Sequence, residues 1–302
     1  HGVTEALQLI FAAVLEEGTK VLAPGPHYPP YMAYPQMYGA ETVEYQLHST
    51  DQWKPDFSDI RAKMDDDVRL LVLINPNNPC GSVCGPDDID ALLAIARDFP
   101  NCIVVADEIY DGLDFTGEQV SVASRSTDVP VIALNGVSKV YYAPGWRIGY
   151  MALHDPQRRL TLVRDGLERL LRSRLCASTP AQMGYLAGLE GDRGWMEVYA
   201  KRVQQQRDHC LRRIQGIDGL EVEHPGGAFY MFIRLTDERW AADDKAFVLD
   251  LLHEEHVLLV HGSGFSPDLG KGHVRLVYLA DVSVLDEVFD RIDRFLKKHR
   301  QG

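Results

Sequence analysis

The sequence lacks any apolar run long enough to cross a membrane. A membrane-spanning helix needs about 20 consecutive apolar residues, and no run in this chain of 302 residues approaches that length. Basic charge is also scarce, because 31 lysines and arginines stand against 44 aspartates and glutamates and leave a net charge of −13. We therefore expect neither a nucleic acid nor an anionic membrane surface as a partner.

Cysteine is sparse as well. The five cysteines are odd in number and scattered, which is typical of a reducing compartment and predicts a cytoplasmic protein. Cys80 and Cys84 lie close in sequence, but no second Cys/His pair lies near them, so we expect no metal site. The chain also lacks an initiator Met and a basic signal region, and a helical pattern begins within its first residues. We expect that an N-terminal segment of the natural protein is missing.

Apolar runs alternate with helical stretches from residue 1 to about residue 150. The pattern predicts helices at 4–16, 57–64 and 86–98 and strands at 20–24, 68–75, 102–108 and 129–136. Continuous Val/Ile/Leu runs indicate strands that are buried on both faces. Their alternation with helices predicts an α/β fold with a mainly parallel sheet between helices.

The second half of the chain follows a different pattern. A long helix at about 194–215 is expected to bridge two domains, a large one over 1–195 and a smaller α+β one over 196–302. The small domain would contain the short strands "AFYMFIR", "VLLVHG" and "HVRLVYL" and a closing helix at 283–298.

Polar motifs follow three successive predicted strands. Asn78 lies in "NPNNPCG" (75–81), Asp107 and Tyr110 lie in "ADEIY", and Lys139 follows the strand at 129–136. Each motif alone has an ordinary explanation, as a turn, a helix cap or a solvated lysine. Because parallel strands place their carboxyl ends at one edge of the sheet, we expect all four side chains to face one crevice.

This combination of side chains suits pyridoxal phosphate chemistry. That cofactor needs a lysine for its Schiff base, an acid near its pyridinium nitrogen and a positive cup for its phosphate. Lys139 meets the first need and Asp107 the second. Arg147, in "APGWRIGY", meets the third together with backbone N–H groups at the start of the helix at 4–16.

Five separated motifs, from "GVTEAL" at 2–7 to "GHVRLVYLA" at 272–280, give the chain a clear resemblance. It resembles the class I/II aminotransferases of the fold type I pyridoxal phosphate enzymes. The resemblance implies a seven-stranded, mainly parallel sheet, a homodimer, and ping-pong transfer of an amino group between an L-amino acid and a 2-oxo acid. In that family the N-terminal segment closes over the substrate and supplies residues to the partner's site.

The resemblance also implies how the cofactor is held. "GVTEAL" is similar to the family's phosphate-binding helix start, where Val3 and Thr4 offer N–H groups. "HYPPY" resembles the segment that stacks on the cofactor ring, which points to Tyr28. Asn78 and Tyr110 are then expected to donate hydrogen bonds to the ring oxygen.

The same resemblance implies the catalytic and substrate-binding residues. Lys139, Asp107 and Tyr110 are the expected catalytic residues, and Lys139 moves the substrate proton. Arg275, in "HVRLVYL", is expected to bind the substrate carboxylate, with Asn78 beside it.

Two positions depart from the family pattern. Cys80 replaces a usual threonine, which we expect to affect the turn alone. Gly136 stands where many relatives have a phosphate-binding serine, so we expect that contact to be absent or supplied by water. The segments 51–64 and 166–182 resemble the alanine-type aminotransferases most, which predicts alanine or a similar small or acidic amino acid as donor and 2-oxoglutarate as an acceptor.

Other interpretations stay open at this point. A β-lyase or a cyclopropane-forming synthase on the same fold would keep every residue named above. An aminotransferase-like sensor domain of a transcription regulator would need a DNA-binding segment upstream. A dinucleotide-binding protein is disfavoured, because the glycines of "HGSGFSPDLG" (261–270) do not open a helix.

Overall fold

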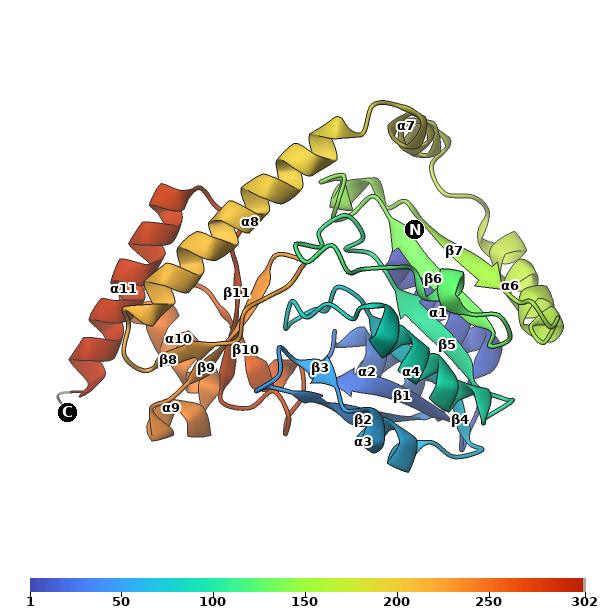
Figure 1. Ribbon diagram of the computed structural model, residues 1–302, viewed down its shortest axis with the longest axis horizontal. Coiled ribbons are helices and arrows are strands. Elements are labelled where there is room, and N and C mark those ends of the chain that lie inside the picture. Colours follow the sequence, from blue (N-terminus) through green and yellow to red (C-terminus); the bar gives the residue numbers. More distant parts are fainter. Residues whose placement is uncertain (301–302) are drawn as a thin grey trace.

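The computed structural model describes residues 1–300, which form two β-sheets joined by one long helix (Figure 1). The first sheet has the strand order β3-β2-β1-β4-β5-β6-β7. Its strands are β1 (Lys20–Gly25), β2 (Glu41–His48), β3 (Lys54–Pro55), β4 (Val68–Ile74), β5 (Ile103–Asp107), β6 (Val131–Gly136) and β7 (Gly149–His154). Five neighbouring strands are parallel, namely β2, β1, β4, β5 and β6. The two edge strands, β3 and β7, each pair with their neighbour in the antiparallel direction. The predicted α/β class and mainly parallel sheet are confirmed.

Helices cover both faces of this sheet, which explains the continuous apolar runs. In β4, Val72 and Ile74 pack into one core with α1 and α2, whereas Leu71 and Leu73 pack into the other with α3 and α4. Side chains that alternate between two buried faces must all be apolar. The helices of this half are α1 (Val3–Val14), α2 (Pro30–Gln36), α3 (Phe57–Lys63), α4 (Pro86–Arg97), α5 (Val122–Arg125), α6 (Thr161–Arg174) and α7 (Thr179–Glu190).

The start of α3 follows from a local sequence signal. The Asp56 carboxylate accepts hydrogen bonds from the backbone N–H groups of Ser58 and Asp59, so it caps α3 as a helix-start aspartate should. The antiparallel strand β7 was not predicted, and its exposed and half-buried residues explain why it lacks a continuous apolar run.

The long helix α8 (Gly194–Gln215) leads to the second sheet, as the sequence predicts (Figure 1). This C-terminal sheet has the order β10-β11-β9-β8 and is antiparallel throughout. Its strands are β8 (Leu220–Val222), β9 (Tyr230–Leu235), β10 (Val260–His261) and β11 (His273–Val277), and its helices are α9 (Glu238–Ala242), α10 (Asp244–Glu255) and α11 (Val282–Arg300).

The strand expected from "VLLVHG" is much shorter than predicted. It shrinks to β10, because the short 3₁₀ turn η2 (Gly262–Gly264) begins directly after it. The backbone is crowded there, since a Cβ atom on Gly262 would lie 2.1 Å from the carbonyl oxygen of Gly270. The chain therefore leaves the sheet at a close backbone contact.

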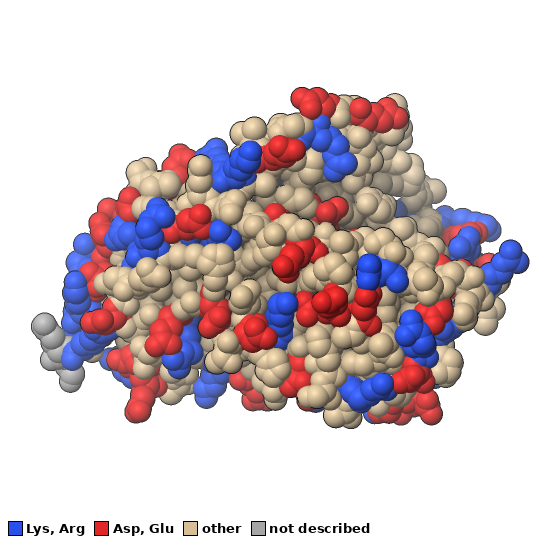
Figure 2. All heavy atoms as spheres, viewed as in Figure 1, with Lys and Arg blue, Asp and Glu red and all other residues tan. Residues whose placement is uncertain are grey.

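Charges of both signs are mixed on the molecular surface. Lysine and arginine side chains lie among aspartates and glutamates over the face shown in Figure 2. Within residues 1–300, no helix has both the length and the apolar character that a membrane crossing requires.

Candidate active site

A cavity of about 360 Å³ lies at the carboxyl ends of β4, β5 and β6, where the C-terminal sheet meets the first sheet. All nine residues that the sequence singles out line it: Val3, Thr4, Tyr28, Asn78, Asp107, Tyr110, Lys139, Arg147 and Arg275. The structure therefore brings together side chains that lie as far apart in sequence as Val3 and Arg275.

One end of the cavity is positively polarised. Helix α1 starts here, and the first N–H groups of a helix have no partner within it. Arg147 lies beside this helix start and donates hydrogen bonds from Nη1 to the carbonyl oxygen of Pro144, 2.7 Å away, and from Nη2 to that of His1, 3.0 Å away. Gly2 has a φ of 78°, a backbone conformation that favours glycine, and a Cβ atom there would lie 2.5 Å from Nη2 of Arg147 and displace the guanidinium. A helix start beside a guanidinium is an anion site.

The structure explains the missing serine at position 136. A Cβ atom on Gly136 would lie 2.6 Å from the carbonyl oxygen of Ile148, so a serine does not fit this backbone. Ser138, which the sequence analysis missed, lines the cavity instead, with its hydroxyl oxygen 3.4 Å from Nη1 of Arg147. Its place directly before Lys139 was the available signal.

Asp107 ends β5 and is 4% exposed. The Tyr31 hydroxyl donates to its Oδ2 atom at 2.9 Å, and the backbone N–H of Ile109 donates to Oδ1 at 3.3 Å. Burial raises the pKa of Asp107 to about 6, although the hydrogen bonds and the charge of Lys139 oppose that rise. Sequence reasoning missed Tyr31, whose signal was its spacing of three residues from Tyr28 across a helix start.

Lys139 lies in the loop after β6, and its side-chain nitrogen lies near two aromatic rings. Its Nζ atom is 5.9 Å from the centroid of the Tyr110 ring and 5.8 Å from that of Phe229. Burial lowers the pKa of Lys139, and the positive charge of Arg275 lowers it further, while Asp107 opposes both. A lysine with a lowered pKa offers more of the neutral amine, which is the form that acts as nucleophile and base.

Arg275 reaches the cavity from β11 of the C-terminal sheet. Its Nη1 atom donates to Oδ1 of Asn78 at 2.8 Å, and its guanidinium carbon lies 4.6 Å from the centroid of the Tyr230 ring and 4.7 Å from that of Phe265. Among the described residues, its buried Nε atom has no hydrogen-bond partner. The guanidinium is positioned by its hydrogen bond to Asn78, and its Nε–H group is still available as a donor. Such a group is suited to bind a carboxylate.

Tyr230 is a second cavity residue that the sequence analysis did not single out. It lies on β9, and its hydroxyl is 2.9 Å from that of Tyr110, at the end of the neighbouring sheet. A hydrogen bond inside the cavity thus joins β9 to the segment that follows β5.

The donor set fits pyridoxal phosphate. The anion site at α1 and Arg147 suits a phosphate, the buried carboxylate of Asp107 suits a ring N–H, and Lys139 offers a reactive amine. Comparison with known proteins agrees with this fit. A family model described as "Aminotransferase class I and II" matches residues 1–292. The chain belongs to the class I and II aminotransferases.

This aminotransferase has relatives of assigned activity. It is 36% identical over 308 residues to the glutamate-pyruvate aminotransferase AlaA of Haemophilus influenzae, a match that covers 100% of this chain and 75% of the relative. It is 33% identical to the alanine aminotransferase of Mycobacterium tuberculosis, where the match covers 100% of this chain and 71% of the relative.

Solved structures give the same result for the fold. The alanine aminotransferase from Pyrococcus furiosus is 45% identical with a TM-score of 0.95, and the match covers 98% of this aminotransferase and 75% of that chain. An aminotransferase from Escherichia coli is 35% identical with a TM-score of 0.92, covering 98% and 74%. The predicted fold type, transaminase activity and pyridoxal 5′-phosphate cofactor are confirmed.

Proposed function

We propose that this aminotransferase transfers an amino group between alanine, or a similar small or acidic amino acid, and a 2-oxo acid such as 2-oxoglutarate. The observation that carries the proposal is the single cavity in which Lys139, with a lowered pKa, lies near Asp107 and Arg275. The names of the relatives support alanine, glutamate and pyruvate as the substrates. Both half-reactions use one site, so the kinetics are ping-pong.

The residues at the two ends of the cavity would hold the cofactor. The N–H groups of Val3 and Thr4 bind its phosphate together with Arg147, and Ser138 adds a hydroxyl. Tyr28, which lines the cavity, would stack on one face of the ring. Once bound, pyridoxal phosphate supplies the electron sink that a carbanion at the substrate Cα needs.

The other side chains hold or move protons. Asp107, ionised above a pH of about 6, would accept a hydrogen bond from the ring nitrogen of the bound cofactor. Asn78 and Tyr110 donate hydrogen bonds to the ring oxygen. Lys139 Nζ, which also anchors the cofactor, takes the proton from the substrate Cα and later returns it. Arg275 binds the α-carboxylate bidentately, a geometry that a lysine cannot reproduce.

The substrate part of the proposal is tested with a panel of amino acids, each supplied with pyruvate or with 2-oxoglutarate. We expect alanine with 2-oxoglutarate to give one of the highest values of kcat/KM. If an aromatic or basic amino acid exceeds alanine by tenfold or more, the choice of donor is wrong while the transaminase class stands.

We further propose a homodimer, which rests on an exposed apolar surface formed by α6 and α7. Leu175, Met183 and Leu186 are 79%, 60% and 43% exposed, and Leu175 and Leu186 line one hollow together with Leu171 and Leu189. No residue of α7 is buried. A helix that is largely apolar yet uncovered marks an interaction surface.

Sedimentation tests the homodimer. The wild type should sediment as a dimer, and Met183→Glu should sediment as a monomer because a buried carboxylate opposes the contact. Leu258→Glu is the matched control, since Leu258 is 71% exposed but lies in the C-terminal part. A dimer that persists in the Met183→Glu variant rules out this surface.

The cellular compartment and the domain limits are also proposals. The five cysteines are free thiols, and four of them are buried, which supports the reducing cytoplasm. The two separate sheets support a large domain over 1–195 and a small domain over 196–302, with α8 as the connection.

A further inference from the structure

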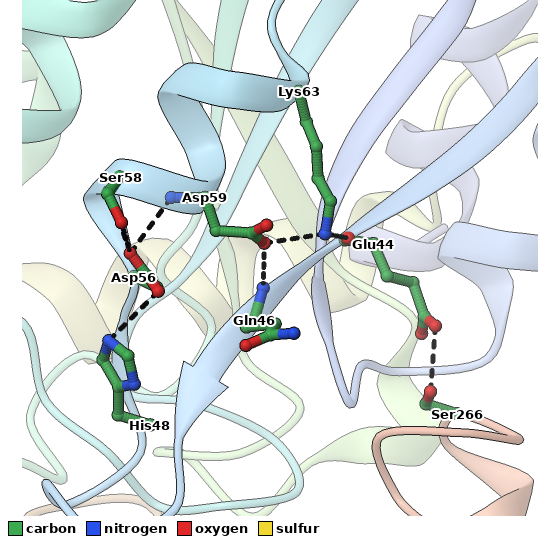
Figure 3. A network of polar contacts seen from close by, with 8 residues as sticks. All are labelled: Glu44, Gln46, His48, Asp56, Ser58, Asp59, Lys63 and Ser266. Atoms are coloured by element: carbon green, nitrogen blue, oxygen red, sulfur yellow. Dashed lines mark hydrogen bonds and ion pairs between the residues drawn. The ribbon is translucent and has the colours of Figure 1, made fainter.

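A buried polar cluster that catalysis does not use lies between the two sheets. It consists of His27, in the loop before α2, Glu44 on β2, and Ser266, in the segment after η2. His27 and Ser266 are 1% and 0% exposed, and the Glu44 side chain is 16% exposed. Figure 3 shows the Glu44 carboxylate directed at Ser266, whose hydroxyl donates to Oε2 at 2.9 Å.

The contacts of the His27 ring show which of its nitrogens carries a hydrogen. Nδ1 lies 3.0 Å from the carbonyl oxygen of Tyr28. A carbonyl oxygen can only accept a hydrogen bond, so Nδ1 carries a hydrogen. If the imidazole is neutral, Nε2 therefore presents a lone pair.

The other ring nitrogen faces a second acceptor. Nε2 of His27 lies 3.2 Å from Oε1 of Glu44, and neither atom makes a well-directed hydrogen bond within residues 1–300. Two buried lone pairs at this distance repel each other, and burial makes that repulsion expensive. A proton on Nε2 or on Oε1 removes the repulsion in either case.

We propose that His27 and Glu44 hold one proton between them, and that this proton latches the segment 262–270 of the small domain onto the loop that carries Tyr28. The two residues are positioning residues. Their effect on catalysis rests on the proposed function, because Tyr28 is a wall of the proposed cofactor site.

The surrounding contacts support a latch. The backbone N–H of His27 donates to the carbonyl oxygen of Phe265 at 3.2 Å, and the Phe265 ring packs on Arg275. A Cβ atom on Gly25 would lie 2.5 Å from Cδ1 of Leu269, so the Leu269 side chain packs directly against the backbone of Gly25. The cluster thus contacts the segments that carry Tyr28 and Phe265, and both Tyr28 and Arg275 line the cavity.

Other titratable groups near the pair already have partners. The Tyr31 ring centroid lies 6.5 Å from that of His27, and its hydroxyl is bonded to Asp107. Lys63 donates to the backbone oxygen of Glu44 at 2.8 Å and pairs with the Asp59 carboxylate at 2.7 Å (Figure 3). Among the described residues, His27 is the one basic side chain that pairs with the Glu44 carboxylate.

The variant Glu44→Gln keeps the shape of the side chain but removes the carboxylate that shares the proton with His27. The glutamine oxygen can accept from Ser266 while its NH₂ group donates to Nε2 of neutral His27, so the contact no longer depends on pH. His48→Gln is the matched control. His48 lies on the same strand and contacts Oδ2 of Asp56 at 3.4 Å, but its side chain is 46% exposed (Figure 3).

The readout is hydrogen exchange of segment 262–270 in the protein loaded with pyridoxal phosphate, corrected for intrinsic exchange rates. Protection is followed as the pH is raised. When the shared proton leaves, protection in the wild type and in His48→Gln should fall by roughly tenfold or more, the effect of losing a charged hydrogen bond. In Glu44→Gln it should stay constant. The same pH dependence in wild type and Glu44→Gln would overturn the latch.

Steady-state kinetics then test the positioning role. The KM for the amino donor should rise more steeply with alkaline pH in the wild type than in Glu44→Gln, and coincident KM profiles would overturn that role. Hydrogen exchange needs no turnover, so an inactive protein with the expected exchange pattern refutes the proposed function and leaves the latch standing. If Glu44→Gln does not fold, Ser266→Ala should lower protection at neutral pH, and unchanged protection there contradicts the latch.

Discussion

The hydroxyl of Tyr31 donates a 2.9 Å hydrogen bond to Oδ2 of Asp107, which lines the cavity. The bond favours the carboxylate over the carboxylic acid, and so does the nearby charge of Lys139. Burial acts in the opposite direction and prevails, which leaves the pKa of Asp107 at about 6. Asp107 is therefore ionised at neutral pH.

Tyr31→Phe should move the acid limb of the activity profile to higher pH. Removal of the hydrogen bond raises the pKa of Asp107, and a hydrogen bond to a charged group is worth roughly 1.5–3 kcal/mol, or about one to two pH units. The measurement is the pH profile of kcat/KM. Tyr34→Phe on the same helix is the control and should leave the profile unchanged. An unshifted acid limb in Tyr31→Phe would show that this bond does not set the ionisation of Asp107.

Asp107→Asn should slow catalysis while it stabilises the cofactor-free protein. An amide cannot balance the charge of a pyridinium, so proton abstraction slows although the cofactor still binds. The pKa of Asp107 is raised from 3.8 to about 6 in the folded state, so above pH 6 the ionised carboxylate costs up to about 3 kcal/mol of stability. That cost disappears below the unfolded pKa.

Denaturant unfolding at two pH values measures this effect. The variant should gain stability over the wild type at pH 7 and much less at acidic pH, with Asp66→Asn, at an exposed aspartate outside the cavity, as the control. A variant that is less stable than the wild type at pH 7 contradicts the assignment of burial as the dominant cause.

Arg275→Lys should weaken substrate binding by roughly 1.5–3 kcal/mol, because a lysine cannot form two parallel bonds to a carboxylate and leaves Oδ1 of Asn78 without its donor. The dissociation constant of a carboxylate substrate measures the loss. Arg234→Lys is the matched control, since Arg234 lies on the adjacent strand and pairs with Glu221 at the surface. Equal affinity in Arg275→Lys and wild type removes Arg275 from the site.

Lys139 should be the one residue labelled when the loaded protein is reduced with borohydride and digested. Its place after β6 and its lowered pKa make it the reactive amine. Peptide mass spectrometry identifies the modified lysine. A label on a different lysine, such as Lys20 or Lys54, refutes the assignment.

The sequence was informative where one local pattern determined both fold and site. The apolar runs that end at Ile74, Asp107 and Gly136 became adjacent parallel strands, so polar residues just beyond them had to meet. Asn78, Asp107 and Lys139 could be placed together for that reason alone.

Other features depend on contacts between distant segments and could not be predicted. The bond from Tyr31 to Asp107 joins residues 76 positions apart, and the bond from Ser266 to Glu44 joins residues 222 positions apart. At Gly136 the sequence indicated that one phosphate contact is absent or supplied by water, but it could not show that the carbonyl oxygen of Ile148 occupies the space that a serine would need. Such steric limits become visible only when the backbone is known.

The most direct test of the central claim is a product balance. The loaded protein is supplied with L-alanine and 2-oxoglutarate, and pyruvate, glutamate and ammonia are measured together for wild type and Lys139→Ala. We predict equal amounts of pyruvate and glutamate with no ammonia in the wild type, and a rate lower by roughly 10²–10⁴-fold or more in Lys139→Ala. Ammonia released without glutamate, or unchanged turnover in Lys139→Ala, would contradict transamination at this site.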